Sequence, residues 1–195
     1  MAQTEREKML AGELYLASDP ELVAAQARAQ ELLAAFNGAA PGAEAERRAI
    51  LRDLLGEIGE GVVIKPSLRC DYGTQIRIGA RTFINYDAVM LDCAAIEIGA
   101  DVQIAPGVHL YTATHPLDGP LRRSGAEFAL PIRIGDGVWL GGGVIVCPGV
   151  TIGANTVVGA GAVVTKDLPA NCVAAGNPCR VLRFLGEDGR DPGAA

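Results

Sequence analysis

An aliphatic residue recurs at every sixth position in the C-terminal half of the chain, and this period constrains the fold more than any other feature. The series runs without a break through Ile134, Leu140, Val146, Ile152, Val158 and Val164. A period of six fits neither the 3.6-residue turn of a helix nor the two-residue alternation of a strand, and it is typical of parallel β-helices. The pattern therefore predicts a solenoid of short strands around a buried aliphatic column.

Upstream the same period is present but interrupted. Two registers, offset by two residues, are occupied by Ile78, Ile84 and Met90 and then by Ile98, Ile104 and Leu110. The second register is in phase with Ile134, so we expect residues 116–131 to form a loop extruded from one corner. Loops on rigid scaffolds carry function more often than the scaffold does.

The segments that flank the repeat differ from it in composition. Residues 1–60 predict helices, because Asp19-Pro20 offers an N-cap and a first-turn proline before an alanine-rich stretch that ends near Gly38. A second helix is expected over 42–55. Residues 61–180 predict the solenoid, and residues 181–195 a short closing helix followed by a frayed tail.

Composition narrows the class of protein. With 49% hydrophobic residues the chain can form a packed core, and its 25 glycines suit tight corners. A net charge of −6 without a basic stripe argues against a nucleic-acid partner. Five cysteines without CxxC spacing signal neither a disulfide framework nor a zinc site, and no apolar stretch reaches membrane-spanning length. We expect a cytoplasmic protein with no membrane partner.

Longer motifs add a resemblance. They are KMLAGELY, RCDYG, HLYTATHPLD, SGAEF, IGDGVWLGGGVIVCPGVTIG and VVTKDLPANCVAAGNPCRV. Together they resemble the left-handed β-helix acetyltransferases, and within them the maltose and galactoside O-acetyltransferase family, closest to the maltose branch. The resemblance implies a mainly β fold, a left-handed parallel β-helix with an N-terminal helical segment. It further implies a homotrimer that moves an acetyl group from acetyl-coenzyme A (acetyl-CoA) to a hydroxyl of maltose, glucose or a related saccharide, without a metal.

His115 is the candidate general base. It lies in Thr114-His115-Pro116 at the mouth of the loop, and a neutral imidazole can accept a proton from a hydroxyl. A lone histidine is more often a packing residue, but the resemblance favours the catalytic role and implies direct transfer. Glu127 is a candidate to orient the imidazole, or else a solvated loop carboxylate. Asn85 could position the acceptor and stabilise the oxyanion, or serve as a left-handed corner residue.

Candidate coenzyme contacts occur in the later coils. Trp139, the only tryptophan, is expected to face outward and either pack or line the pantetheine slot. Gly142 belongs to a glycine triplet whose N–H groups are open to a thioester oxygen. By resemblance the remaining contacts are Ala160, Thr165, Lys166, Arg180 and Arg183. The three cations among them would bind the nucleotide phosphates, or would otherwise be a solvated face.

The acceptor side departs from the family pattern. By resemblance the sugar would be bordered by Asp71, Phe83, Asn85, Asp92 and Cys93, and carboxylates suit neighbouring hydroxyls. The pattern has a polar or acidic residue at Ala17 and an arginine at Gln26, and the galactoside branch has an aspartate at Cys93. We expect these differences to affect which sugar is bound and to leave the acetyl-transfer chemistry intact.

Two other classes stay open. A zinc carbonic anhydrase of similar coil architecture needs three histidine ligands per metal, whereas this chain has only His109 and His115. A non-catalytic or acceptor-diverged hexapeptide-repeat scaffold is compatible with the changes at Ala17 and Gln26. The joint presence of His115, Asn85, Trp139 and Lys166 favours the enzyme.

Overall fold

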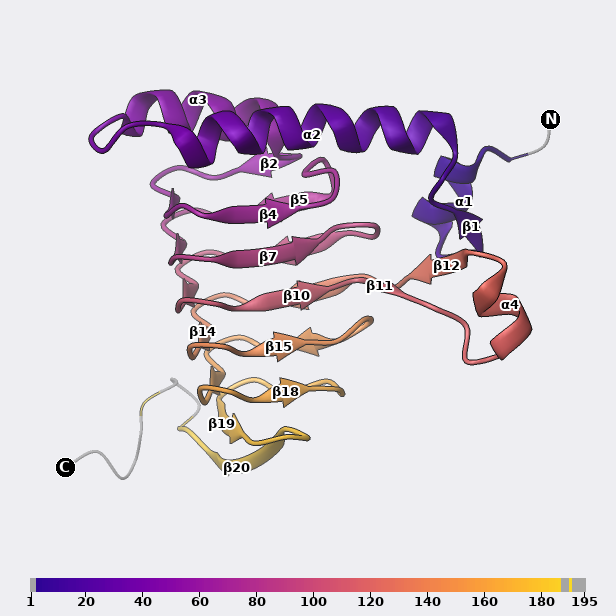
Figure 1. The fold of residues 1–195 in the computed structure, drawn as a ribbon. Coiled ribbons are helices and arrows are strands. Elements are labelled where there is room, and N and C mark those ends of the chain that lie inside the picture. Colours follow the sequence, from indigo (N-terminus) through magenta and orange to yellow (C-terminus); the bar gives the residue numbers. More distant parts are fainter. Residues whose placement is uncertain (1–2, 187–189, 191–195) are drawn as a thin grey trace.

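The computed structural model describes residues 3–186 and 190, in which three parallel sheets form a solenoid beneath two long helices (Figure 1). We name each sheet by its first strand. In spatial order, the β2 sheet consists of β16 (Thr151–Ile152), β13 (Ile132–Ile134), β8 (Ile96–Ile98), β5 (Ile76–Ile78) and β2 (Glu57–Ile58). The β4 sheet consists of β18 (Val163–Val164), β15 (Ile145–Val146), β10 (His109–Tyr111), β7 (Ala88–Leu91) and β4 (Leu68–Cys70). The β3 sheet consists of β20 (Arg180–Phe184), β19 (Cys172–Ala175), β17 (Val157–Val158), β14 (Trp139–Leu140), β9 (Gln103–Ile104), β6 (Phe83–Ile84) and β3 (Val63–Ile64).

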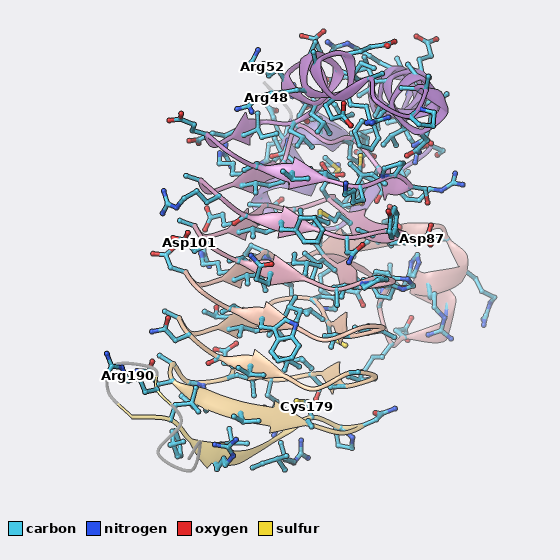
Figure 2. All side chains as sticks on the ribbon, turned by 90° about the vertical axis from the view of Figure 1, so that its left-hand side faces the viewer. Arg48, Arg52, Asp87, Asp101, Cys179 and Arg190 are labelled. Carbon is cyan, nitrogen blue, oxygen red and sulfur yellow. The ribbon has the colours of Figure 1, made fainter. Side chains whose placement is uncertain are left out.

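The core is the predicted aliphatic column. Ile78, Ile98, Ile134 and Ile152 stand in register on consecutive strands of the β2 sheet, and all four are buried. Their neighbours in the same strands point outward, since side chains alternate along a strand. Figure 2 shows side chains filling the inside of the coils while many charged groups project from the edges. The hexapeptide period therefore corresponds to one inward-facing residue on each of the three sides of a coil.

The coils differ in length at one corner. Ile134 pairs with Ile152, which gives a coil of 18 residues, whereas Ile58 pairs with Ile78 and Ile78 with Ile98, which gives coils of 20. Ile98 pairs with Ile134, so the coil that holds the loop has 36 residues. All the additional residues lie between the β4 sheet and the β2 sheet, in residues 71–75, 91–95 and 111–131. We call these segments the expanded corner.

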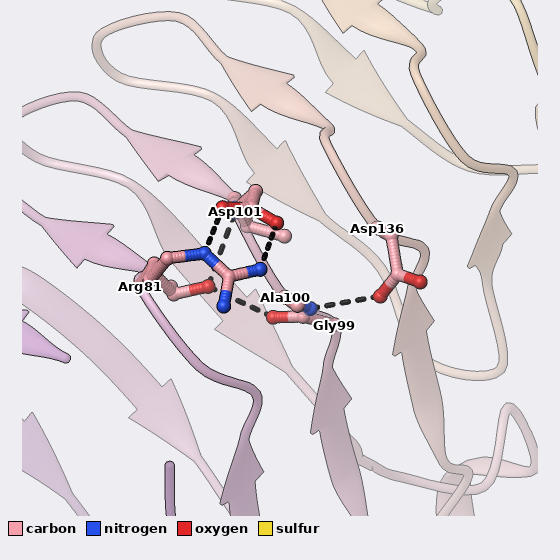
Figure 3. Close-up of polar contacts among 7 residues, drawn as sticks. Arg81, Gly99, Ala100, Asp101 and Asp136 are labelled. Atoms are coloured by element: carbon pink, nitrogen blue, oxygen red, sulfur yellow. Dashed lines mark hydrogen bonds and ion pairs between the residues drawn. The ribbon is translucent and has the colours of Figure 1, made fainter. Parts of the chain in front are cut away.

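The other two corners keep a constant step from coil to coil. At the corner between the β2 and β3 sheets, Arg81 and Asp101 have left-handed backbones, with φ of 59° and 58°. The Arg81 guanidinium binds the Asp101 carboxylate at 2.7 and 2.6 Å, and the Ala100 N–H donates to Asp136 at 2.8 Å (Figure 3). Such ladders stabilise the turn.

Helices close the N-terminal end of the solenoid. The Asp19 side chain caps α2 (Pro20–Gly38) by accepting from the Glu21 N–H at 2.9 Å, as the sequence predicts. Leu33 of α2 and Leu51 of α3 (Glu44–Leu54) belong to the buried cluster that continues into the coils. A further helix, α1 (Glu5–Ala11), and strand β1 (Tyr15–Leu16) lie beside the loop (Figure 1). None of the helices in the described ranges is long and apolar enough to cross a bilayer.

The predicted closing helix is wrong. Residues Arg180–Phe184 form β20, which pairs antiparallel with β19 and covers the free edge of the last coil. Val181 and Phe184 are residue types enriched in strands, and pairing satisfies backbone groups that an open sheet edge would leave exposed. The tail predicted to fray lies almost wholly outside the described residues.

Candidate active site

The expanded corner holds a pocket of about 350 Å³. Its walls come from α2, the first coils and the loop, namely Ala17, Gln26, Asp71, Tyr72, Leu91, Cys93, Ala113, His115 and Glu127. The loop leaves the coil through β11 (Ala113–Thr114), forms α4 (Gly119–Arg123) and returns through β12 (Ala126–Ala129). Because β12 pairs with both β11 and β1, the loop is held by backbone hydrogen bonds at its neck. The sequence prediction of an extruded loop is confirmed, with strands at its base.

His115 and Glu127 face each other across this neck. The His115 Nε2 lies 3.8 Å from the Glu127 Oε2, and the side chains are 55% and 17% exposed. This distance is within ion-pair range but longer than a hydrogen bond. A carboxylate beside Nε2 favours the tautomer with its hydrogen there, which leaves the Nδ1 lone pair to accept a proton. Two residues twelve positions apart in the sequence thus have the geometry of a base and its orienting partner.

Asp71 forms the wall opposite the loop. Its carboxylate accepts from the Gln26 amide and from the Cys93 thiol, each at 3.4 Å. Burial raises the pKa of Asp71, and it does so against the lowering effect of these two donors, while the negative charge of Glu127 raises the pKa further. Within the described chain no lysine or arginine lines the pocket, so its fixed charges are acidic.

Asp92 does not line the pocket, contrary to the sequence prediction. Its side chain is fully buried and accepts backbone N–H groups of Asp71 at 3.0 Å, Tyr72 at 2.8 Å and Gln75 at 3.2 Å. Burial raises the pKa of Asp92 to about 6, although these backbone donors oppose the change. The carboxylate therefore holds the turn that presents Asp71, because each additional residue at this corner brings a backbone N–H that needs an acceptor.

Asn85 and Phe83 lie on another part of the coil. Phe83 belongs to β6 in the β3 sheet, and Asn85 follows it at the corner that leads to the β4 sheet. The Asn85 side chain accepts from the Tyr86 N–H at 2.9 Å, and the left-handed residue of this turn is Asp87. The interpretation of Asn85 as a left-handed corner residue is therefore wrong. Within one chain neither residue reaches the His115 pocket.

The corner between the β3 and β4 sheets, which we call the second corner, also carries Gly142 and Ala160. Gly142 donates no backbone hydrogen bond within the described residues, and a β-carbon placed there would meet only the Pro106 carbonyl oxygen, at 3.5 Å. Trp139 lies in β14, the strand of the β3 sheet that leads into Gly142, and it is 53% exposed, as predicted. An open N–H beside an exposed indole can accommodate an amide- or thioester-containing ligand.

The predicted phosphate-binding residues lie toward the C-terminal end of the solenoid. Lys166 and Arg180 line one open pocket of about 220 Å³ together with Cys179. Thr165 precedes Lys166 at the same corner, and Arg183 lies on β20 opposite Val173. Two cations from segments distant in sequence thus meet at one surface.

Some pocket residues escaped the sequence prediction. Tyr72, Leu91 and Ala113 line the pocket; Leu91 and Ala113 have apolar side chains, and Tyr72 carries a phenol within the RCDYG motif. Tyr72 follows Asp71, Leu91 precedes Asp92, and Ala113 lies two residues before His115. Proximity to these predicted site residues was the signal that could have found them.

Comparisons with known families agree with this geometry. The family model described as "Maltose acetyltransferase hexapeptide capping motif" matches residues 8–59, and "Bacterial transferase hexapeptide (six repeats)" matches residues 131–166. The galactoside O-acetyltransferase of Escherichia coli (strain K12) is 38% identical over 187 residues, which cover 96% of this chain and 91% of that protein.

Two solved structures are similar along nearly the whole chain. A maltose O-acetyltransferase from Clostridium difficile 630 superposes with a TM-score of 0.94 at 49% identity, covering 96% of this chain and 100% of the other. A hexapeptide-repeat acetyltransferase from Vibrio cholerae O1 biovar eltor, complexed with acetyl-CoA, gives 0.88 at 42% identity, with coverages of 95% and 100%.

Fold and comparisons together define the class: this protein is a hexapeptide-repeat acetyltransferase with the left-handed parallel β-helix of that class. Within the class, the chain belongs to the maltose and galactoside O-acetyltransferase family.

Proposed function

We propose that this protein transfers the acetyl group of acetyl-CoA directly to a hydroxyl of a saccharide such as maltose or glucose, with His115 as general base. The observation that carries the proposal is the His115–Glu127 pair at the mouth of a pocket lined by polar groups. In this reaction the imidazole takes the proton of the attacking hydroxyl and returns it to the departing thiolate. Glu127 keeps the ring in the required tautomer.

The coils offer a matching site for the coenzyme. The open Gly142 N–H is suited to donate to the developing oxyanion, and Trp139 and Ala160 border the same surface. Lys166, Arg180 and Arg183, with Thr165, would hold the phosphates. The acetyl-CoA complex of the Vibrio cholerae relative supports this assignment. Five free cysteines and the use of this coenzyme favour a cytoplasmic location.

A homotrimer would complete the site. Asn85 and Gly142 occupy one corner of the coil and His115 another, so a single chain does not bring base and oxyanion donors together. Packing one subunit's expanded corner against the second corner of its neighbour would place them in one cleft. There Asn85 and Phe83 of one subunit would face Asp71 and Cys93 of the other. Asp92 contributes only by holding the Asp71 turn.

The test is thiol release from acetyl-CoA with glucose, maltose, galactosides, amino sugars or no acceptor. His115→Ala is expected to lower acceptor-dependent release by about 10³-fold. His109→Ala is the matched control, because His109 lies in β10, bonds to the Tyr111 hydroxyl and does not line the pocket. Coenzyme binding without release for any sugar would overturn the saccharide assignment. Absence of coenzyme binding would overturn the enzyme assignment and favour a scaffold.

A further inference from the structure

Tyr15 is a buried residue with a polar hydroxyl that the pocket does not account for. Its side chain is 1% exposed, and its hydroxyl has no hydrogen-bond partner among the described residues. Buried hydroxyl groups in native proteins almost always have a partner, so an orphan calls for a reason. Tyr15 does not line the acceptor pocket, which excludes direct contact with the sugar as that reason.

The neighbourhood of Tyr15 identifies a partner. In the antiparallel pair of β1 and β12, Tyr15 stands directly opposite Glu127, and residues so paired project from the same face. Tyr15 also packs in one buried cluster with Tyr72 and Cys93. Burial raises the pKa of Tyr15 far above its ordinary value, and the nearby Cys93 and Glu127 add to this effect. The phenol therefore stays protonated and can donate its hydrogen to an anion.

Glu127 is the acceptor on this face. Its carboxylate approaches the His115 Nε2 at 3.8 Å, which is too long for a hydrogen bond, and it lies near enough to the Tyr15 hydroxyl to raise the pKa of that phenol. The Cys93 thiol is already engaged, since it donates to Asp71 at 3.4 Å. A buried hydroxyl without a hydrogen-bond partner among the described residues and a carboxylate held only by a 3.8 Å contact with His115 thus lie on the same face of one strand pair.

We propose that the Tyr15 hydroxyl is a positioning group that donates to the Glu127 carboxylate and so holds it against His115. This inference rests on the proposed function of His115 as the base. When His115 takes up the proton of the acceptor, the Glu127–imidazolium contact shortens, and a donor on the other side of the carboxylate fixes its orientation. The N-terminal arm, which closes on the loop through β1, would thereby become part of the catalytic machinery.

The decisive variant is Tyr15→Phe, which removes one oxygen and preserves the ring. If the hydroxyl positions Glu127, kcat should fall about tenfold while the KM for acetyl-CoA changes less than twofold, and thermal stability should be retained. Thr82→Val is the matched control for stability, since it removes a buried hydroxyl that donates to the Gly99 carbonyl at 2.8 Å and should lower the melting temperature. Unchanged kcat in Tyr15→Phe would overturn the proposal.

A second measurement decides the matter even if no sugar is acetylated. The chain has only two histidines, so ¹⁵N spectra can be assigned with His109→Asn, and ring-nitrogen shifts report the tautomer of His115. In the native protein the Nε2–H form should dominate, and in Tyr15→Phe and Glu127→Gln it should give way to a mixture. The same tautomer ratio in Tyr15→Phe and in the native protein would overturn the inference, whereas failure of the acetyl-transfer assay alone would overturn only the proposed function.

Discussion

The first and last coils of this solenoid share a core but differ at one corner. In the last coils Ile134 and Ile152 are 18 residues apart, and every corner is turned by a short, repeated segment. In the first coils Ile58, Ile78 and Ile98 are 20 residues apart, and the two additional residues fall each time at the expanded corner. The next coil enlarges the same corner into the loop that carries His115.

This difference shows how a repetitive fold acquires a site. An inward column tolerates insertions at a corner because the strands on both sides keep their register with the coils above and below. Additional residues at one corner in three successive coils stack into a wall, and that wall supplies Asp71, Cys93 and His115. The regular coils supply instead a long surface of constant geometry, which suits an extended ligand such as a coenzyme.

Removing the loop is expected to have the largest effect on activity. Deleting residues 113–130 joins Thr112 to Pro131 and shortens this coil from 36 residues to 18, the length of the coil that follows it. The neck residues are already close, since Leu130 N–H donates to the Thr112 carbonyl at 2.9 Å. We expect the solenoid to fold and acceptor-dependent thiol release to fall by more than about 10³-fold, because the deletion removes Glu127 and His115, which we propose as the general base.

Circular dichroism and coenzyme binding are the controls for this deletion. The β signal should persist, and affinity for acetyl-CoA should change only a few-fold, since Trp139, Lys166 and Arg180 lie in other coils. An unfolded deletion variant would show that the solenoid needs the loop in order to fold. The loop would then not be an insertion into an independent scaffold.

The shared core gives the next largest effect. Ile78 and Ile152 lie in the two kinds of coil, and both are buried. Replacement of either by alanine leaves a cavity and should cost about 3–4 kcal/mol in the free energy of unfolding, measured by urea denaturation. Equal costs are expected, because both residues belong to one column. A much smaller cost at Ile78 would mean that the longer coils are more loosely packed.

The sequence predicted the repetitive part of the molecule well for a physical reason. The column residues must be aliphatic in every coil, so the period from Ile134 to Val164 exposes both the strands and their register. The phase shift after Met90 and the return at Ile134 located the loop for the same reason. The two strands of the loop were not predicted, because β11 has only two residues and β12 four. Their formation depends on pairing with other segments and leaves no pattern in the sequence.

Contacts across the coil were harder to predict. Asp71 and Asp92 are both carboxylates at the expanded corner, yet one faces the pocket and the other binds backbone N–H groups inside the turn. Nothing in their neighbouring letters distinguishes these orientations. Tyr15 gave no signal either, because its relation to Glu127 depends on the pairing of segments more than a hundred residues apart.

Asp92 gives the expanded corner a dependence on pH. Its pKa of about 6 in the folded protein exceeds the usual value near 3.9, so the folded state binds the proton more tightly than the unfolded state. The associated stability is fully present below about pH 4 and is lost as the pH rises through 6. The difference in unfolding free energy between native protein and Asp92→Asn should therefore change by about 3 kcal/mol between pH 4 and pH 7.

Asp101 at a regular corner is the contrasting case. Its exposed carboxylate pairs with Arg81, and this hydrogen bond lowers the pKa of Asp101. The stability that it contributes is present above the unfolded pKa and is lost as the pH falls. Asp101→Asn should thus remove a pH dependence of the unfolding free energy that has the opposite sign to that of Asp92. The change should also be smaller, since exposed ion pairs contribute little. The same sign in both variants would contradict this assignment.

The smallest expected effect concerns which acceptor the pocket takes. Gln26 donates to Asp71 at 3.4 Å, and no cation in the described chain lines the pocket beside Asp71 and Glu127. Acceptors that carry a carboxylate should therefore react poorly, and Gln26→Arg should raise kcat/KM for a uronic acid about tenfold relative to glucose, because a guanidinium offsets the two carboxylates. Gln30→Arg is the matched control, since Gln30 lies one turn further along α2, donates to the Cys70 carbonyl and is not part of the pocket wall. An equal gain from both variants would mean that overall charge steers the acceptor, and the local charge of the expanded corner would then not select it.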